Sequence, residues 1–316
     1  MNDKEIRSPI LITAGATYLD IDAYACMVAM AELLRLRGEA AVAYSLAPCN
    51  YSICSSLIKD GQVERHLPCG KPRDSFGYVV VDVSDPKFLE SSVPIERVVA
   101  IYDHHTGFED YWHERLGDNS HIEFIGAAAT LVYREWKTAE LAEQMTKDTA
   151  KLLIAAVLDN TLNLTSQNTT AEDRVAFSEL CALAGVDDAW CAEYFLEVQE
   201  NVIADLKNAL LGDMKSVRDN PYLPPKLLQI SVFDANGVIE MLPVIREWLA
   251  TIADAWMINI IDIKQNCSYF VCDDNYYRNR IEQVFNVHFE SGVAKSAVPY
   301  LRKEIIKKTT LLKDKK

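Results

Sequence analysis

Three apolar segments of the sequence each lead into residues that can bind a metal ion. The run Val98 to Ile101 precedes an Asp-His-His triplet, Tyr78 to Val81 precedes one aspartate, and Ile10 to Ile12 leads into an Asp-Ile-Asp sequence. In open α/β sheets, ligand-binding residues gather beyond the carboxyl ends of the strands. We therefore expect one site that contains Asp103, His104, His105, Asp82, Asp20 and Asp22.

The residue types indicate a centre for hard divalent cations. Two aspartates at positions i and i+2, such as Asp20 and Asp22, can point toward neighbouring metals, and Asp82 at the end of an adjacent strand can bridge them. Carboxylates with one imidazole, here His104, suit Mn or Mg better than a thiolate-bound metal, and Asp103 can orient the histidines. Two such metals activate a water and clamp a phosphoryl group. Helix or turn capping is the commoner role of a single loop aspartate, but the combination favours the metal site.

Composition excludes several classes of protein. The chain has 316 residues, 49% of them hydrophobic, and a formal net charge of -14, which argues against nucleic acid or a membrane surface as a partner and leaves a small anionic substrate possible. The eight cysteines show no repeated C-x-x-C spacing, which is typical of reduced thiols in a cytosolic protein. The N-terminal residues are charged where a signal peptide would be apolar. We expect a soluble, cytoplasmic protein.

The hydrophobic pattern predicts two domains. The first domain is expected over residues 1–200. From Pro9 to about Tyr102, apolar runs alternate with helical segments, including an amphipathic helix over Ala23 to Arg37, and the sequence is mainly helical from Gly126 to Gly212. Residues 201–316 read as an α+β domain with strands over 227–233, 256–263 and 268–272 and a helix over 239–253. The expected fold class is α/β, with a parallel-sheet domain, a smaller α+β domain and an active site in the cleft between them.

The ordered motifs resemble those of the DHH phosphoesterase superfamily. Its subgroup with a DHHA2 C-terminal domain contains manganese-dependent (family II) inorganic pyrophosphatases, exopolyphosphatases and prune-like proteins. The resembling segments are Gly15 to Ala23, Val80 to Asp82, Asp103 to His105, Ile125 to Thr130, Leu158 to Ser166, Asp213 to Lys215 and Ile261 to Ile263. The Asp-His-His triplet alone is weak evidence, whereas the ordered set is specific.

The resemblance implies a role for each matching residue. Asp20 would bind one manganese (or magnesium or cobalt) ion, Asp22 and His104 the other, and Asp82 both. His105 would contact the substrate phosphate or its leaving group, and Lys215 and Lys295 of the second domain would bind phosphate. Family pyrophosphatases are often dimers through an edge strand, so a homodimer is expected.

The chain departs from the family pattern at three places. Ala16 stands where pyrophosphatases carry a metal-binding histidine. In the fourth motif, Asn160 stands where the family has a metal-binding aspartate, and Asp159 stands one position earlier. We expect the metal at this position to bind more weakly, because a neutral amide carbonyl does not replace a negative charge.

The third departure is in the C-terminal phosphate clamp, which retains Lys295 but lacks its arginine. Arg302 and Lys303 are possible substitutes, although a solvated helix face is the commoner role for such residues.

These observations leave two classes of function. The first is a metal-dependent phosphohydrolase that cleaves the phosphoanhydride bonds of pyrophosphate or short polyphosphate through metal-activated water, with a nucleotide phosphodiesterase as the rival within the class. The second is a degenerate relative that binds a phosphorylated metabolite or a partner protein with little hydrolysis. The retained aspartates and histidines favour the enzyme, and the three departures favour the binding protein.

Overall fold

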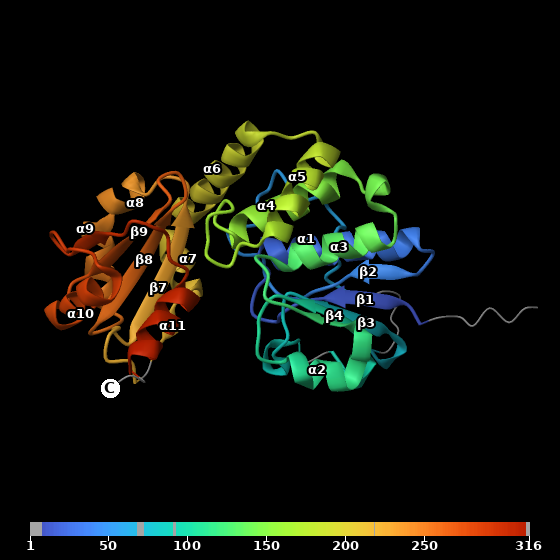
Figure 1. The fold of residues 1–316 in the computed structure, drawn as a ribbon, viewed down its shortest axis with the longest axis horizontal. Coiled ribbons are helices and arrows are strands. Elements are labelled where there is room, and N and C mark those ends of the chain that lie inside the picture. Colours follow the sequence, from blue (N-terminus) through green and yellow to red (C-terminus); the bar gives the residue numbers. More distant parts are fainter. Residues whose placement is uncertain (1–7, 68–72, 91–92, 218, 314–316) are drawn as a thin grey trace, which may run out of the picture. The chain divides into compact units, whose positions relative to one another are not determined.

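The computed structural model describes residues 8–67, 73–90, 93–217 and 219–313. The chain forms two compact units, Met1–Cys191 and Ala192–Lys316, and each unit is built on a five-stranded sheet (Figure 1). Within the described ranges, no helix combines the length and the apolar character needed to cross a bilayer.

The sheet of the first unit is entirely parallel. Its strands are β1 (Ile10–Thr13), β2 (Ala41–Ala43), β3 (Gly77–Val81), β4 (Val98–Asp103) and β5 (Ser120–Ile122), in the order β2-β1-β3-β4-β5. Every residue of β3 is buried, as its uninterrupted apolar sequence predicts. Because all five strands run the same way, the residues that follow β1, β3 and β4 emerge at one edge of the sheet.

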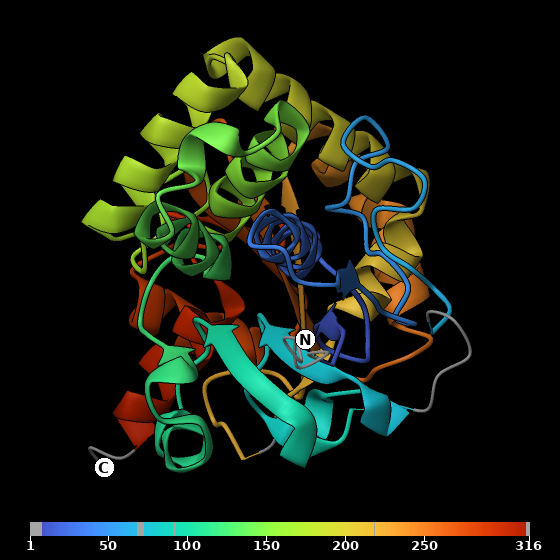
Figure 2. The ribbon, with the colours of Figure 1, turned by 90° about the vertical axis from the view of Figure 1, so that its right-hand side faces the viewer.

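Helices cover both faces of this sheet (Figures 1 and 2). Helix α1 (Ile21–Leu36) lies against the strands, and α3 (Ala128–Thr138) packs beside it against β4. Helix α4 (Lys147–Asn160) packs on α1 and α3. Helix α5 (Ala171–Ala184) packs on α4. The helix predicted at Ala23 to Arg37 is therefore present, but the prediction that it is amphipathic was wrong. The helix is buried on almost every side because other helices cover it.

On the opposite face, α2 (Glu109–Leu116) closes a second part of the core. Its Trp112 is fully buried among apolar residues of the sheet, such as Tyr78 and Ile101. The Trp112 indole Nε1 donates a hydrogen bond to the carbonyl oxygen of Ser84, at 2.7 Å. The Ser84 hydroxyl donates in turn to the carbonyl of His105, at 3.0 Å. These contacts fix the loop after β3 to the loop after β4.

The helical segment predicted for residues 126–212 is confirmed, and it continues through α6 (Asp188–Ala204) and α7 (Leu206–Gly212). Thr170 begins α5 with a capping box in which the Thr170 and Asp173 side chains accept each other's backbone N–H. The Asp187 carboxylate accepts from the backbone N–H groups of Ala189 and Trp190 at the start of α6.

The second unit has a mixed sheet. Its strands are β6 (Lys215–Ser216), β7 (Lys226–Val232), β8 (Trp256–Asp262), β9 (Cys267–Cys272) and β10 (Val293–Lys295), in the order β10-β9-β8-β7-β6. Of the strand pairings in the described part of this sheet, β7 with β8 is parallel and the others are antiparallel. Besides α7 and most of α6, this unit contains α8 (Asn236–Glu240), α9 (Leu242–Leu249), α10 (Asn275–Phe285) and α11 (Arg302–Lys313). The predicted α/β fold, with a parallel-sheet unit and a smaller unit, is confirmed.

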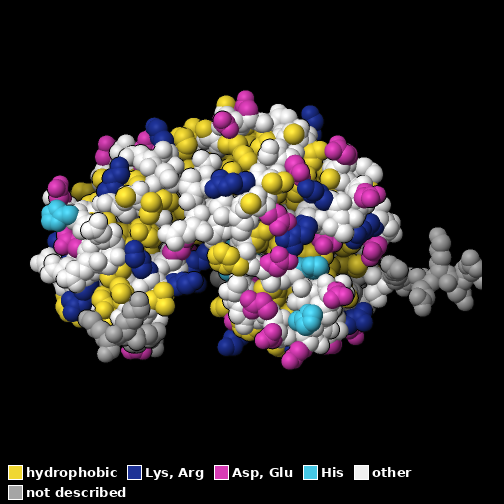
Figure 3. Space-filling view, viewed as in Figure 1, with side chains coloured by type: hydrophobic (Ala, Val, Ile, Leu, Met, Phe, Trp, Pro, Cys, Tyr) yellow, Lys and Arg dark blue, Asp and Glu magenta, His cyan; other side chains and the backbone are white. Residues whose placement is uncertain are grey.

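The charged surface of the first unit is mixed in sign. Figure 3 shows acidic and basic side chains interspersed on the viewed face of this unit. The Arg134 guanidinium donates to the carboxylates of both Glu123 and Glu172, and Lys137 pairs with Glu179 at 2.8 Å. The basic residues of α3 are thus paired with nearby carboxylates.

Candidate metal centre

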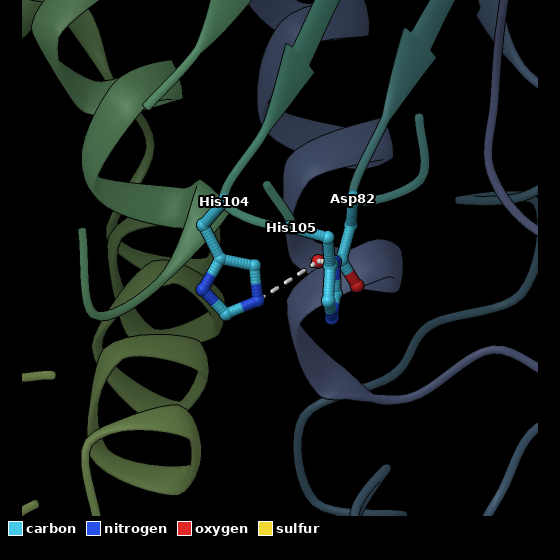
Figure 4. A group of neighbouring side chains, drawn as sticks. All are labelled: Asp82, His104 and His105. Carbon is cyan, nitrogen blue, oxygen red and sulfur yellow. Dashed lines mark ion pairs between the residues drawn. The ribbon is translucent and has the colours of Figure 1, made fainter. Parts of the chain in front are cut away.

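Two adjacent strands bring one aspartate and two histidines together. Asp82 follows β3, and His104 and His105 follow β4 (Figure 4). The Asp82 Oδ1 atom lies 3.5 Å from His104 Nε2 and 3.9 Å from His105 Nδ1. One potential ligand atom from each residue lies within 4.8 Å of the others. Asp82 has a φ of 56°, a left-handed conformation that a non-glycine residue rarely adopts and that often marks a functional site.

The orientation of His104 suits a metal ligand. Its Nδ1 atom lies 3.2 Å from the carbonyl oxygen of Ile125, which can only accept a hydrogen bond. Nδ1 therefore carries the proton, and in the neutral imidazole the lone pair is on Nε2, the atom that faces Asp82. A backbone carbonyl that fixes the tautomer in this way is the usual support of a metal-binding histidine. His104 is almost fully buried, so this orientation is held by packing as well.

Asp103 holds the second histidine. Its Oδ1 accepts from the His105 backbone N–H at 3.1 Å and lies 2.9 Å from His105 Nδ1. Burial raises the pKa of the Asp103 carboxyl, but the hydrogen bond from His105 and the nearby histidine charges outweigh burial and lower it. The His105 side chain is 56% exposed, whereas Asp103 is fully buried. The buried Asp103 carboxylate therefore fixes the orientation of the His105 imidazole, which remains accessible to solvent.

Asp20 and Asp22 lie at the start of α1. Asp20 is the N-cap residue, and its Oδ1 accepts from the Ala23 backbone N–H at 3.0 Å. The capping role that a lone aspartate commonly has is thus present here. Asp22 is fully buried, and its two oxygens accept from the backbone N–H groups of Ala128 and Ala129 at the start of α3, at 2.8 Å each.

Burial and the charges of neighbouring aspartates act on the pKa values of Asp22 and Asp82. Burial, followed by the charge of Asp20, raises the pKa of Asp22 to about 7, even though the two amide hydrogen bonds lower it. Burial also raises the pKa of Asp82 well above its usual value, and the charges of Asp20, Asp22 and Asp103 add to this effect. The structure therefore brings together all four aspartates and both histidines that the sequence analysis placed at this edge.

The donor set fits a divalent cation. Asp82 Oδ1 and Asp103 Oδ2 are buried and have no hydrogen-bond partner within the described ranges. A buried, unpaired carboxylate oxygen is unfavourable unless a proton or a cation compensates it. Oxygen and imidazole ligands without a thiolate match the preference of Mn and Mg. Within the described ranges, the potential ligand atoms that lie close together belong to Asp82, His104 and His105. A contribution of Asp22, whose two oxygens accept from the α3 amides, stays a prediction.

The fourth-motif residues, Asp159 and Asn160, lie on a helix and not at the end of a strand. Asp159 and Asn160 form the last turn of α4, where the Asn160 amide donates to the Ala156 carbonyl at 3.5 Å. Within the described ranges, the cluster of potential ligand atoms comprises Asp82, His104 and His105 and does not include Asp159. The contribution of Asp159 and Asn160 to metal binding stays a prediction.

The predicted phosphate-binding residues lie in the second unit. Lys215 is on β6 and Lys295 is on β10, which are the opposite edge strands of the sheet. The Lys295 ammonium donates to Gln265 Oε1 at 2.6 Å. Lys303 is exposed on α11. The sheet order does not bring Lys215 and Lys295 to one point.

Arg302 has a protein partner instead of an open position. Its guanidinium donates to the side-chain and backbone oxygens of Asp213, and the two side chains are only 17% and 16% exposed. The sequence names Arg302 as a possible replacement for the missing clamp arginine. In the structure its guanidinium instead compensates the charge of Asp213, which is largely buried.

The sequence analysis named Ile125 to Thr130 as a motif, but it did not identify the groups that support the centre from behind. These are the Ile125 carbonyl, the amides of Ala128 and Ala129, and the Asp173 carboxylate, which accepts from the Gly126 N–H at 3.0 Å. Backbone groups leave no signal in a sequence. Asp173 had one, because it stands three residues after Thr170 in the capping-box pattern, but that pattern predicts only a helix start.

The comparisons with known proteins agree with this geometry. No protein-family model matches the chain. The manganese-dependent inorganic pyrophosphatase of Bacillus subtilis is 24% identical over 292 residues, which cover 87% of this chain and 89% of the relative. A protein of an Exiguobacterium species named "probable manganese-dependent inorganic pyrophosphatase" is 25% identical over 314 residues, which cover 89% of this chain and 94% of that protein.

The fold comparison points the same way. A crystal structure assigned as a family II inorganic pyrophosphatase from Methanococcus jannaschii superposes with a TM-score of 0.64 at 18% identity, over 95% of this chain and 99% of that chain. At this identity the match establishes the fold. The resemblance to manganese-dependent pyrophosphatases that the motifs indicated is confirmed.

Proposed function

We propose that this protein is a divalent-metal-dependent phosphohydrolase that cleaves the phosphoanhydride bonds of pyrophosphate or short polyphosphate. The observation that carries the proposal is the convergence of Asp82, His104 and His105 beyond two adjacent parallel strands, with a buried Asp82 oxygen that lacks a hydrogen-bond partner. The pyrophosphatase names of the relatives support the reaction class. The substrate is a small phosphorylated anion, not a nucleic acid, and the protein acts as a homodimer.

In this proposal the protein residues have distinct roles. Asp22, Asp82 and His104 hold a manganese, magnesium or cobalt ion, which supplies charge neutralisation of phosphoryl oxygens and a lowered pKa for water. Asp20 would hold a second ion, and one of the two ions is held more weakly, because Ala16 and Asn160 stand where the family carries charged or imidazole ligands. The negative charges of the aspartates would then be compensated, and the surrounding structure holds Asp82 in its left-handed conformation.

His105 is the group of this chain best placed to handle a proton. Asp103 accepts from its Nδ1, which stabilises the imidazolium and leaves Nε2 to donate to a phosphate oxygen or to the leaving group. The exposed fraction of 56% for the His105 side chain is compatible with contact to a bound substrate. Asp103 is thus a positioning residue for His105.

The second candidate is a relative that binds phosphorylated ligands with little hydrolysis. Two observations favour it: Arg302 is engaged by Asp213, and Asn160 supplies a neutral amide. In that case, metal binding would be retained without turnover. A nucleotide phosphodiesterase is the third candidate, and it differs from the first only in its substrate.

One experiment separates the candidates. Metal-stripped protein is given Mn, Mg or Co, and release of phosphate or nucleotide is measured with pyrophosphate, tripolyphosphate, long polyphosphate and a dinucleotide. We expect Mn-dependent release from pyrophosphate or tripolyphosphate that is lost in Asp82→Ala. Metal binding without turnover on any substrate would replace the enzyme with the binding protein, and cleavage of the dinucleotide alone would establish the phosphodiesterase.

A further inference from the structure

Asp173 is a fully buried carboxylate whose partners are all uncharged. It stands in the first turn of α5, outside the acidic cluster. Its Oδ2 accepts from the Gly126 N–H at 3.0 Å and from the N–H and hydroxyl of Thr170 at 2.7 and 2.8 Å. Its Oδ1 accepts from the Thr130 hydroxyl at 2.6 Å. A helix cap requires fewer donors than this carboxylate receives. The additional donors compensate the burial of its oxygens.

The Gly126 segment that Asp173 holds touches both sides of the metal centre. One residue before Gly126, the Ile125 carbonyl accepts from His104. Two and three residues after it, the amides of Ala128 and Ala129 donate to Asp22. The position of this short segment therefore sets the orientation of two proposed metal ligands that are 82 residues apart in the sequence (Asp22 and His104).

The contact between Asp173 and Gly126 is close as well as polar. A Cβ atom on Gly126 would lie 2.6 Å from Asp173 Oδ2 and 2.6 Å from Thr161 Cγ2, which is closer than real Cβ atoms approach. Glycine is therefore required for the segment to lie against the carboxylate. The carboxylate and the glycine together fix the segment from the side away from the ligands.

We propose that Asp173 is a positioning residue of the metal centre, which acts through Gly126 on His104 and Asp22. This inference rests on the proposed function, because it takes those two residues as metal ligands. Without the carboxylate, the Gly126 amide and the Thr130 hydroxyl lose their acceptor. The Ile125 carbonyl and the α3 amides are then no longer held in place, and the two ligands lose their fixed orientation.

A purely structural role for Asp173 makes a different prediction, because the residue also completes the capping box of α5. Loss of that box would lower stability without a specific effect on metal binding. Thr170→Ala is the matched control: it removes the N-cap side chain, at a cost of about 1 kcal/mol, and leaves the contacts of Asp173 with Gly126 and Thr130.

The test is the Mn²⁺ affinity of metal-stripped protein, measured by electron paramagnetic resonance for the wild type, Asp173→Ala, Asp173→Asn and Thr170→Ala. We expect a loss of affinity of about 10- to 100-fold in Asp173→Ala, as for other residues that support metal ligands. Asp173→Asn keeps one acceptor oxygen and should lose less. Thr170→Ala should bind like the wild type despite its lower stability.

A second readout needs no metal. ¹⁵N NMR of the histidine rings should show His104 protonated at Nδ1 in the wild type and in Thr170→Ala, and a mixture of tautomers in Asp173→Ala. Equal Mn²⁺ affinity in Asp173→Ala and Thr170→Ala, with an unchanged tautomer, would overturn the inference. If Asp173→Ala does not fold, the same comparison is decided with Asp173→Asn. A wild type that binds no Mn²⁺ would refute the proposed function, and the tautomer would still decide whether Asp173 positions His104.

Discussion

The metal-free protein should lose stability as the pH rises from 5 to 8. Asp22 has an ordinary pKa of 3.8 that the fold raises to about 7, and the pKa of Asp82 is raised as well. Between these pH values the folded state binds more protons than the unfolded state, so the free energy of unfolding falls as the pH rises. The loss is complete above the folded pKa, and it disappears below the unfolded pKa, where both states are protonated.

The magnitude follows from the shift of Asp22. One pKa unit corresponds to about 1.4 kcal/mol, so a rise from 3.8 to about 7 amounts to about 4 kcal/mol of stability lost between pH 3.8 and pH 7. About 3 kcal/mol of this loss falls between pH 5 and pH 8. Asp82 adds to the loss in the same direction. For a folded unit of this size, about 4 kcal/mol lowers the melting temperature by about 10 °C.

The assay is thermal unfolding of metal-stripped protein at several pH values, with and without Mn²⁺, for the wild type and Asp82→Asn. The variant removes one buried charge, so it should be the more stable protein at pH 8, and the difference should disappear only below pH 3.8, the ordinary pKa of an aspartate. Mn²⁺ should raise the melting temperature of the wild type at pH 8 and have little effect on the variant. Parallel pH curves for the two proteins would refute the argument that these carboxylates are strained by burial and repulsion.

Two further substitutions test separate contacts. Gly126→Ala should destabilise the first unit by about 1 to 3 kcal/mol, because the added methyl overlaps Asp173; unchanged stability in chemical denaturation would contradict the close contact. Arg302→Met should destabilise the second unit by about 3 kcal/mol, because it leaves the buried Asp213 unpaired. The double variant with Asp213→Asn should recover most of that loss, whereas a loss of phosphate affinity at full stability would assign Arg302 to the substrate.

The edge of the sheet where the centre lies could be predicted from sequence because its signals are local. Asp82 and the triplet Asp103 to His105 directly follow apolar runs, and parallel strands necessarily bring such positions to one edge. The order of the motifs added the resemblance to pyrophosphatases. Neither inference required knowledge of a contact between distant segments.

The remaining features depend on contacts that no local pattern encodes. The amides that hold Asp22 come from residues 106 and 107 positions later, and the oxygens that bind Arg302 come from Asp213, 89 positions earlier. The burial of α1 on nearly all sides depends on α3 and α4, whose packing cannot be read from the sequence of α1 alone. For this reason Asp22 could be named as a candidate ligand, but the support that orients it could not.

The energetics of the acidic cluster bear on the choice between enzyme and binding protein. Two carboxylates with raised pKa values, an aspartate in a left-handed conformation and a buried oxygen without a partner all make the metal-free fold less stable. A protein that only recognised phosphate would bind it better without these negative charges, because they repel an anion. Their presence is favourable only when cations compensate them. The cost to stability that Asp82→Asn should reveal would therefore be evidence for a metal centre at this edge of the sheet, and the phosphate-release assay then separates the enzyme from the binding protein.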